Sequence, residues 1–118
     1  MTPLPAVRLS SVSRQFHAGS GVVRAVDGVS LDVQRGSLTL LMGPSGSGKT
    51  TLLSLIGGLL PPTEGVVECG GHNLSRLDQP ALTAFRLAHV GMVFQAFRLI
   101  DALTVLENVE LPLTLAGR

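Results

Sequence analysis

The chain has 118 residues, the length of a single domain, and a net charge of +1. Hydrophobic residues make up 45% of it and charged residues 14%. This excludes intrinsic disorder, because disordered chains are poor in apolar side chains and carry high net charge. The near-neutral balance also excludes nucleic-acid binding by bulk electrostatics. Every apolar run is interrupted before the roughly 18 residues that a membrane span needs.

The N-terminal stretch and the cysteine content predict a cytosolic chain. The stretch from Met1 to Ala6 has neither the basic nor the apolar region of a signal peptide. The single cysteine, Cys69, cannot form an internal disulfide. The three histidines, His17, His72 and His89, have no metal-ligand spacing with one another or with Cys69, so we expect them at ordinary surface or turn positions.

The first third of the chain predicts an antiparallel β flank over about residues 1–36. Alternating apolar residues favour a strand over residues 6–13 and another over residues 22–33. The segment H-A-G-S-G at 17–21 predicts the turn between them. Asp27-Gly28 marks a turn or bulge inside the second strand.

Helices and strands alternate over residues 37–118, which predicts an α/β core. After a tight turn at Arg35-Gly36, the short apolar run from Ser37 to Met42 favours a buried parallel strand. Thr51 to Leu60 predicts an amphipathic helix, whose apolar face consists of Leu52, Leu55, Ile56, Leu59 and Leu60, with Leu53 beside it. Gly57-Gly58 with Pro61-Pro62 is typical of a helix end.

Shorter elements complete the expected core. The predictions are a strand at Gly65 to Cys69, a turn at 70–73, a helix at Asp78 to Ala88 with Asp78 as N-cap, and a strand at Val90 to Phe94. Thr104 to Glu107 matches a capping box, which predicts a last helix that Pro112 limits.

One motif carries the chemistry of the chain. Gly43, Pro44, Ser45, Gly46, Ser47, Gly48, Lys49 and Thr50 fit the P-loop pattern G-x-x-x-x-G-K-[S/T]. Its glycines permit a curled backbone whose N–H groups surround a phosphate, and the helix that follows points its positive end at the same oxygens. Lys49, the only lysine, adds a compact positive charge, and the Thr50 hydroxyl suits Mg²⁺.

The residues around this loop are more specific. The segments V-S-L-D-V, G-P-S-G-S-G-K-T-T-L-L, P-P-T-E-G-V-V-E, V-G-M-V-F-Q and L-T-V-L-E-N-V-E-L-P-L together resemble the nucleotide-binding subunits of ABC transporters. They are most similar to the subgroup that serves lipoprotein release, macrolide export and cell division. The resemblance covers residues 9–115.

The resemblance implies a P-loop core of the ABC type that binds ATP and Mg²⁺. Phe16 takes the place of an aromatic residue that stacks on adenine, and Thr51 lies beside the phosphates. Gln95 matches the glutamine that contacts Mg²⁺ and the attacking water, so Thr50 and Gln95 are the expected magnesium contacts. Residues 96–103 would lie near a membrane partner.

The implied partners are an integral membrane permease subunit and a second nucleotide-binding subunit, without nucleic acid or insertion into the membrane. The chain would then be cytoplasmic and peripheral at the inner face of the cell membrane. Its role would be to couple ATP binding and hydrolysis to transport.

The family's later motifs are missing from these 118 residues: the L-S-G-G-Q signature, the Walker B aspartate with its catalytic glutamate, and the switch histidine. The chain therefore resembles the N-terminal half of an ABC ATPase and should bind nucleotide better than it hydrolyses it. An alternative is a non-hydrolysing nucleotide-binding fragment or regulatory remnant. A GTPase or small-molecule kinase is a weaker alternative, because the only lysine is already used and no N-K-x-D motif can exist.

Overall fold

The computed structural model describes residues 4–44, 46–96 and 98–117. Ser45 of the predicted loop, Phe97 of the segment 96–103 and part of the N-terminal stretch lie outside these ranges. The chain forms two compact units divided between Leu77 and Asp78. The boundary of the β flank near residue 36 stays a prediction.

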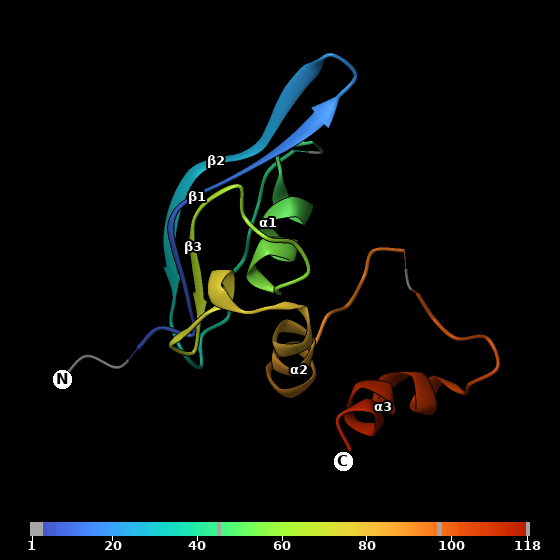
Figure 1. Cartoon of the computed structure of the whole chain (residues 1–118). Coiled ribbons are helices and arrows are strands. Elements are labelled where there is room, and N and C mark those ends of the chain that lie inside the picture. The colour runs from blue at the N-terminus through green and yellow to red at the C-terminus, as the bar shows by residue number, and fades with distance from the viewer. Residues whose placement is uncertain (1–3, 45, 97, 118) are drawn as a thin grey trace. The chain divides into compact units, whose positions relative to one another are not determined.

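The first unit is an antiparallel sheet with one α-helix against it (Figure 1). The sheet order is β2-β1-β3-β4. The strands are β1 (Val7–Ala18), β2 (Gly21–Val33), β3 (Glu64–Cys69) and β4 (His72–Asn73). The helices of this unit are α1 (Lys49–Ile56) and the short 3-10 turn η1 (Leu74–Arg76).

Strands β1 and β2 form a hairpin that is longer than the alternation predicts. His17 pairs with Val22 and Ala18 pairs with Gly21, so β1 runs five residues beyond the predicted end at residue 13. The turn contracts to Gly19 and Ser20, and Gly19 has the positive φ of 62° that such a tight turn needs. Cross-strand pairing therefore outweighs the turn-forming composition of H-A-G-S-G.

The bulge expected at Asp27-Gly28 is confirmed. Val12 pairs with Val29 and Arg14 with Val26, so two residues of β2 oppose Ser13 alone. Gly28 has a φ of 61°, and its N–H donates to Ser13 Oγ at 2.8 Å. This bond satisfies the one polar side chain, 2% exposed, among the buried residues that the structure describes.

The core of the first unit lies between the sheet and α1. Helix α1 begins at Lys49, as the loop motif predicts, and ends at Ile56, where the Gly57 N–H donates to the Leu53 carbonyl at 2.9 Å. This helix contacts β2 and β3 of the sheet. The buried apolar residues of this unit are Leu9, Val12, Val26, Leu52, Leu55, Val67, Cys69 and Leu74.

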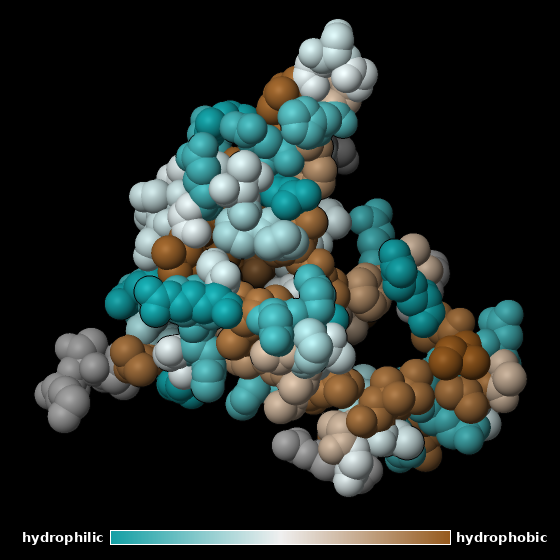
Figure 2. Space-filling view, in the orientation of Figure 1, coloured by the Kyte–Doolittle hydropathy of each residue, from teal (hydrophilic) through white to brown (hydrophobic). Residues whose placement is uncertain are grey.

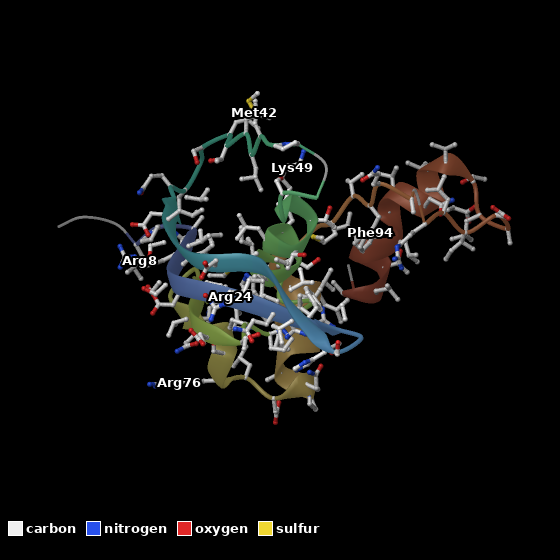
Figure 3. All side chains as sticks on the ribbon, turned by 90° about the horizontal axis from the view of Figure 1, so that it is seen from above. Arg8, Arg24, Met42, Lys49, Arg76 and Phe94 are labelled. Atoms are coloured by element: carbon white, nitrogen blue, oxygen red, sulfur yellow. The ribbon has the colours of Figure 1, made fainter. Side chains whose placement is uncertain are left out.

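The buried parallel strand predicted at Ser37 to Met42 is wrong. The segment has no ladder partner, and Leu38, Leu40 and Met42 are 100%, 80% and 78% exposed. Seen from above, Met42 stands at the outer edge of an open loop (Figure 3). A parallel strand in a sheet interior needs hydrogen-bonded neighbours, and no other strand of the described residues lies beside this segment.

The second unit holds α2 (Gln79–His89) and α3 (Val105–Leu115). Asp78 caps α2 as predicted, since its Oδ1 accepts from the Ala81 N–H at 2.9 Å. The strand predicted at Val90 to Phe94 is wrong: the segment has no regular structure and Val93 is fully exposed.

Helix α3 begins with the predicted capping box but continues past Pro112 to Leu115. The Thr104 N–H donates to Glu107 Oε1 at 2.9 Å, and the Glu107 N–H donates to Thr104 Oγ1 at 3.1 Å. Apolar side chains of α3 face solvent (Figure 2), including Val105, Val109 and Leu115. In the residues that the structure describes, no helix combines the length and apolar character needed to cross a bilayer.

Candidate nucleotide site

The predicted P-loop ends where α1 begins, and its last glycine touches the sheet. Gly48 is the N-cap of α1 with a φ of 92°. A Cβ at this position would lie 2.2 Å from the Ala25 carbonyl oxygen of β2, far inside van der Waals contact. Only glycine fits, because any other residue would meet both the backbone strain and the steric overlap.

The other described glycines of the loop, Gly43 and Gly46, are required for different structural reasons. Gly46 has a φ of 80° with nothing within 4 Å of a built Cβ, so it is needed for conformation alone. A Cβ on Gly43 would lie 2.7 Å from Ser47 Oγ. The Ser47 N–H donates to the Pro44 carbonyl at 3.1 Å, which curls the loop back on itself.

Lys49 and the first turn of α1 give the loop its positive character. The Lys49 Nζ donates to the Gly43 carbonyl oxygen, so the ammonium lies across the mouth of the curled segment. No side chain of the described residues caps Gly48, and the first turn carries no acidic residue. The partial positive charge of the helix start is therefore not neutralised there. In Figure 3 Lys49 lies where α1 meets the loop.

Two hydroxyl groups follow Lys49 on the same turn. Thr50 is exposed and Thr51 is half-buried. The Thr50 carbonyl accepts from Ser54 Oγ at 3.0 Å, a bond within the helix that does not use the Thr50 hydroxyl.

The β1–β2 hairpin carries Phe16 to the neighbourhood of the loop. Phe16 pairs with Val23 on β2, and two residues further along β2 lies Ala25, whose carbonyl faces Gly48. The Phe16 residue is 38% exposed. One strand thus links the predicted base-stacking ring to the predicted phosphate loop within a single unit.

Gln95 lies in the second unit, in an exposed turn. Its neighbour Phe94 has the Arg98 guanidinium 4.8 Å from its ring centroid. Arg98 adopts a φ of 49°, which is uncommon for a residue other than glycine. The role of Gln95 at a magnesium ion stays a prediction.

Arg14, which no sequence motif indicates, contacts Phe16. The Arg14 guanidinium carbon lies 4.8 Å from the Phe16 ring centroid. Residues i and i+2 of a strand share a face. The spacing of Arg14 and Phe16 on β1 is therefore a sequence signal from which their contact could have been predicted. Gly48's contact with Ala25, in contrast, joins segments that only the fold brings together.

No acidic cluster accompanies the loop. Within the described part of the chain, no group of three or more His, Cys, Asp or Glu side chains lies together in a way that could hold a metal ion. The Thr50 hydroxyl is an oxygen ligand of the kind that suits Mg²⁺.

A profile of the ABC transporter family matches residues 26–117. The chain belongs to the ABC transporter family. It is 48% identical over 109 residues to the uncharacterized ABC transporter ATP-binding protein Rv2564 of Mycobacterium tuberculosis. This match covers 92% of the chain and 33% of the relative. It is 43% identical over 117 residues to the macrolide export ATP-binding/permease protein MacB of Hyphomonas neptunium, covering 99% of the chain and 18% of MacB.

Solved structures show the same fold. The ATP-binding cassette MJ0796, a protein of Methanocaldococcus jannaschii, was solved as a dimer in a post-hydrolysis state bound to ADP and Pi. It superposes with a TM-score of 0.89 at 44% identity, over 95% of this chain and 48% of that chain. The ABC-type α/β fold with its antiparallel flank is confirmed. The chain spans 33% of Rv2564, 18% of MacB and 48% of MJ0796.

Proposed function

We propose that this chain binds ATP with Mg²⁺ and is the N-terminal part of the energy-coupling subunit of an ABC transporter. One observation carries the proposal: a curled glycine loop, a single ammonium and the start of a helix meet beside the hairpin that bears Phe16. The state of MJ0796 bound to ADP and Pi supports an adenine nucleotide as the ligand.

Each residue has a part in this proposal. The loop of Gly43, Pro44, Ser45, Gly46, Ser47 and Gly48 surrounds the phosphates, and its residues other than Pro44 offer backbone N–H groups. Thr51 lies beside the phosphates. Lys49 exchanges the Gly43 carbonyl for a phosphate oxygen, a stronger partner because it is charged. Phe16 stacks on the base.

Magnesium, when bound with the nucleotide, neutralises charge on the phosphates. The Thr50 hydroxyl and the Gln95 amide oxygen are the proposed contacts. Thr50 is exposed at the start of α1 and so accessible to such a complex.

The partners of the whole protein are also a proposal. The name of MacB combines ATP-binding with permease, and MJ0796 was solved as a dimer. By analogy, this chain would work with an integral membrane permease subunit and a second nucleotide-binding subunit, at the cytoplasmic face of the membrane. In such an assembly the membrane subunit would determine the transported substrate.

The alternative, for the 118 residues taken alone, is a nucleotide-binding module without turnover. These residues contain no signature, Walker B aspartate or catalytic glutamate. Phosphoryl transfer depends on groups that position water and neutralise charge. We expect negligible steady-state phosphate release from the isolated chain, and turnover at the rate of an intact transporter ATPase would contradict this.

Titration with a fluorescent ATP analogue tests the binding proposal. Lys49→Ala removes the only lysine side chain, and we expect it to weaken binding at least tenfold, about 1.4 kcal/mol. Arg76→Ala is the matched control, because it removes an exposed cation of η1 that lies on the other side of the unit from Lys49 (Figure 3). Equal affinity of the Lys49→Ala and Arg76→Ala variants would refute the proposed site.

A further inference from the structure

The contacts of Arg14 on β1 are unusual for an arginine so close to the surface. Its guanidinium carbon lies 4.8 Å from the centroid of the Phe16 ring, and its Nη1 donates to the Pro61 carbonyl at 2.8 Å. The side chain thus spans from the exposed ring to the turn that follows α1.

Ion pairing does not account for this position. Arg8 and Arg24 pair with carboxylates of the sheet, at 3.1 Å to Asp32 and 2.7 Å to Asp27. Among the residues that the structure describes, no carboxylate lies within 4.0 Å of the Arg14 guanidinium. The buried Arg14 Nε has no hydrogen-bond partner there either. The contacts that hold the group are the aromatic ring and one carbonyl.

The carbonyl is a rigid anchor. Pro61 and Pro62 each have a fixed φ. The turn is bound to β1 on both sides of Arg14: the Thr63 N–H donates to the Ser13 carbonyl at 2.8 Å, and the Gln15 N–H donates to Thr63 Oγ1 at 3.0 Å. The hydrogen bond to the turn therefore fixes the position of the Arg14 guanidinium, and the fixed guanidinium contacts the Phe16 ring.

We propose that Arg14 is a positioning residue for the nucleobase. It covers part of the Phe16 ring and restricts its rotamers, while 38% of Phe16 stays exposed for stacking. A ring fixed in advance loses less conformational entropy when a planar base stacks on it. This inference rests on the proposed ATP site and adds a residue that acts on the base through Phe16.

The test compares two ligands, Mg-ATP and Mg-tripolyphosphate, which share phosphates and differ in the base. A cation over an aromatic ring is attracted by the negative face of the ring. We expect the loss of this contact in Arg14→Ala to weaken Mg-ATP binding about threefold to tenfold and to leave Mg-tripolyphosphate affinity unchanged. Arg14→Lys, which keeps a cation, should restore part of the loss.

Two controls separate positioning from folding. Arg8→Ala removes another arginine of β1 that holds Asp32, and it should change neither affinity. In a Phe16→Ala background, Arg14→Ala should have no further effect on Mg-ATP affinity. If Arg14→Ala does not fold, Arg14→Met keeps the apolar stem without the charge and should show the same selective loss.

The outcomes are distinguishable. If wild-type protein binds neither ligand, the proposed function fails and this inference fails with it. If wild-type protein binds both, but Arg14→Ala binds ATP normally or loses both ligands equally, the positioning role alone is overturned. An Arg14→Ala effect that persists without Phe16 overturns it as well.

Discussion

Gly48 is held by two constraints that act on the same residue. Its φ of 92° disfavours any side chain, and the Ala25 carbonyl occupies the space where a Cβ would lie. The phosphate loop can lie this close to β2 only because residue 48 has no Cβ. The position of α1 relative to the hairpin therefore depends on glycine at this residue. Gly46, with a similar φ and open space around it, carries only the first constraint.

This pair of glycines gives a matched prediction. Gly46→Ala should lower the free energy of unfolding by about 1–2 kcal/mol, the cost of a left-handed conformation for a residue with a Cβ. Gly48→Ala should cost more, about 2–4 kcal/mol, because the Ala25 carbonyl must also move. Urea unfolding of both variants measures the difference, and equal losses would show that the contact with Ala25 is unimportant.

The loop residues can be proposed from the sequence because each has a local chemical reason. Glycine, lysine and threonine at fixed spacing describe a phosphate loop without knowledge of the remaining chain. Arg14 has no such local signature, and its role depends on Pro61, 47 residues away. A sequence motif describes residues that are close in the chain, so it does not predict contacts between distant segments.

At the scale of elements, the capping box of α3 links structure to pH. The backbone N–H of Thr104 donates to the Glu107 carboxylate, and this lowers the pKa of Glu107 from its ordinary value of 4.5. The charged form is thus favoured in the folded helix. Its stabilisation is present above pH 4.5 and is lost as the pH falls through the lowered pKa.

We therefore expect the Thr104 amide to lose hydrogen-exchange protection as the solution is acidified below about pH 4.5. Glu107→Gln is the control, because glutamine can complete a capping box but does not titrate. NMR of the Thr104 amide across this range, corrected for the intrinsic pH dependence of exchange, measures the effect. An identical pH profile in the wild-type and Glu107→Gln proteins would contradict it.

Local signals predicted the helices better than the strands. Asp78 and Thr104 cap their helices through bonds to residues three positions away. The segments at 37–42 and 90–94 have the composition of buried strands, yet composition does not provide the neighbouring strand that a ladder requires. Pro112 is a local signal that gave a wrong prediction. Proline usually ends a helix, but α3 continues past it to Leu115.

At the scale of the molecule, apolar side chains remain exposed in both units. Leu38 and Val93 are fully exposed, and Val105 and Val109 of α3 are 83% and 71% exposed. The solved relatives are about twice as long as the part that this chain matches. Exposed apolar segments with unpaired backbone groups favour association between chains.

We expect the isolated 118-residue chain to self-associate as its concentration rises. Replacing Leu38 and Leu40 with glutamate should reduce association without lowering thermal stability, because both side chains are exposed. Thr39→Glu adds one negative charge to the same segment and keeps its leucines, so it tests whether added charge alone reduces association. Size-exclusion chromatography with light scattering measures the mass, and a monomer at all concentrations would contradict the expectation.

The central claim is that a curled run of backbone amides and one ammonium hold the phosphates of ATP. Isothermal titration calorimetry of the purified, folded chain with Mg-ATP tests it most directly. We predict saturable binding heat at one site per chain, absent or strongly reduced in the Lys49→Ala protein. Folded wild-type protein that gives no heat of binding over a range of temperatures would contradict the account.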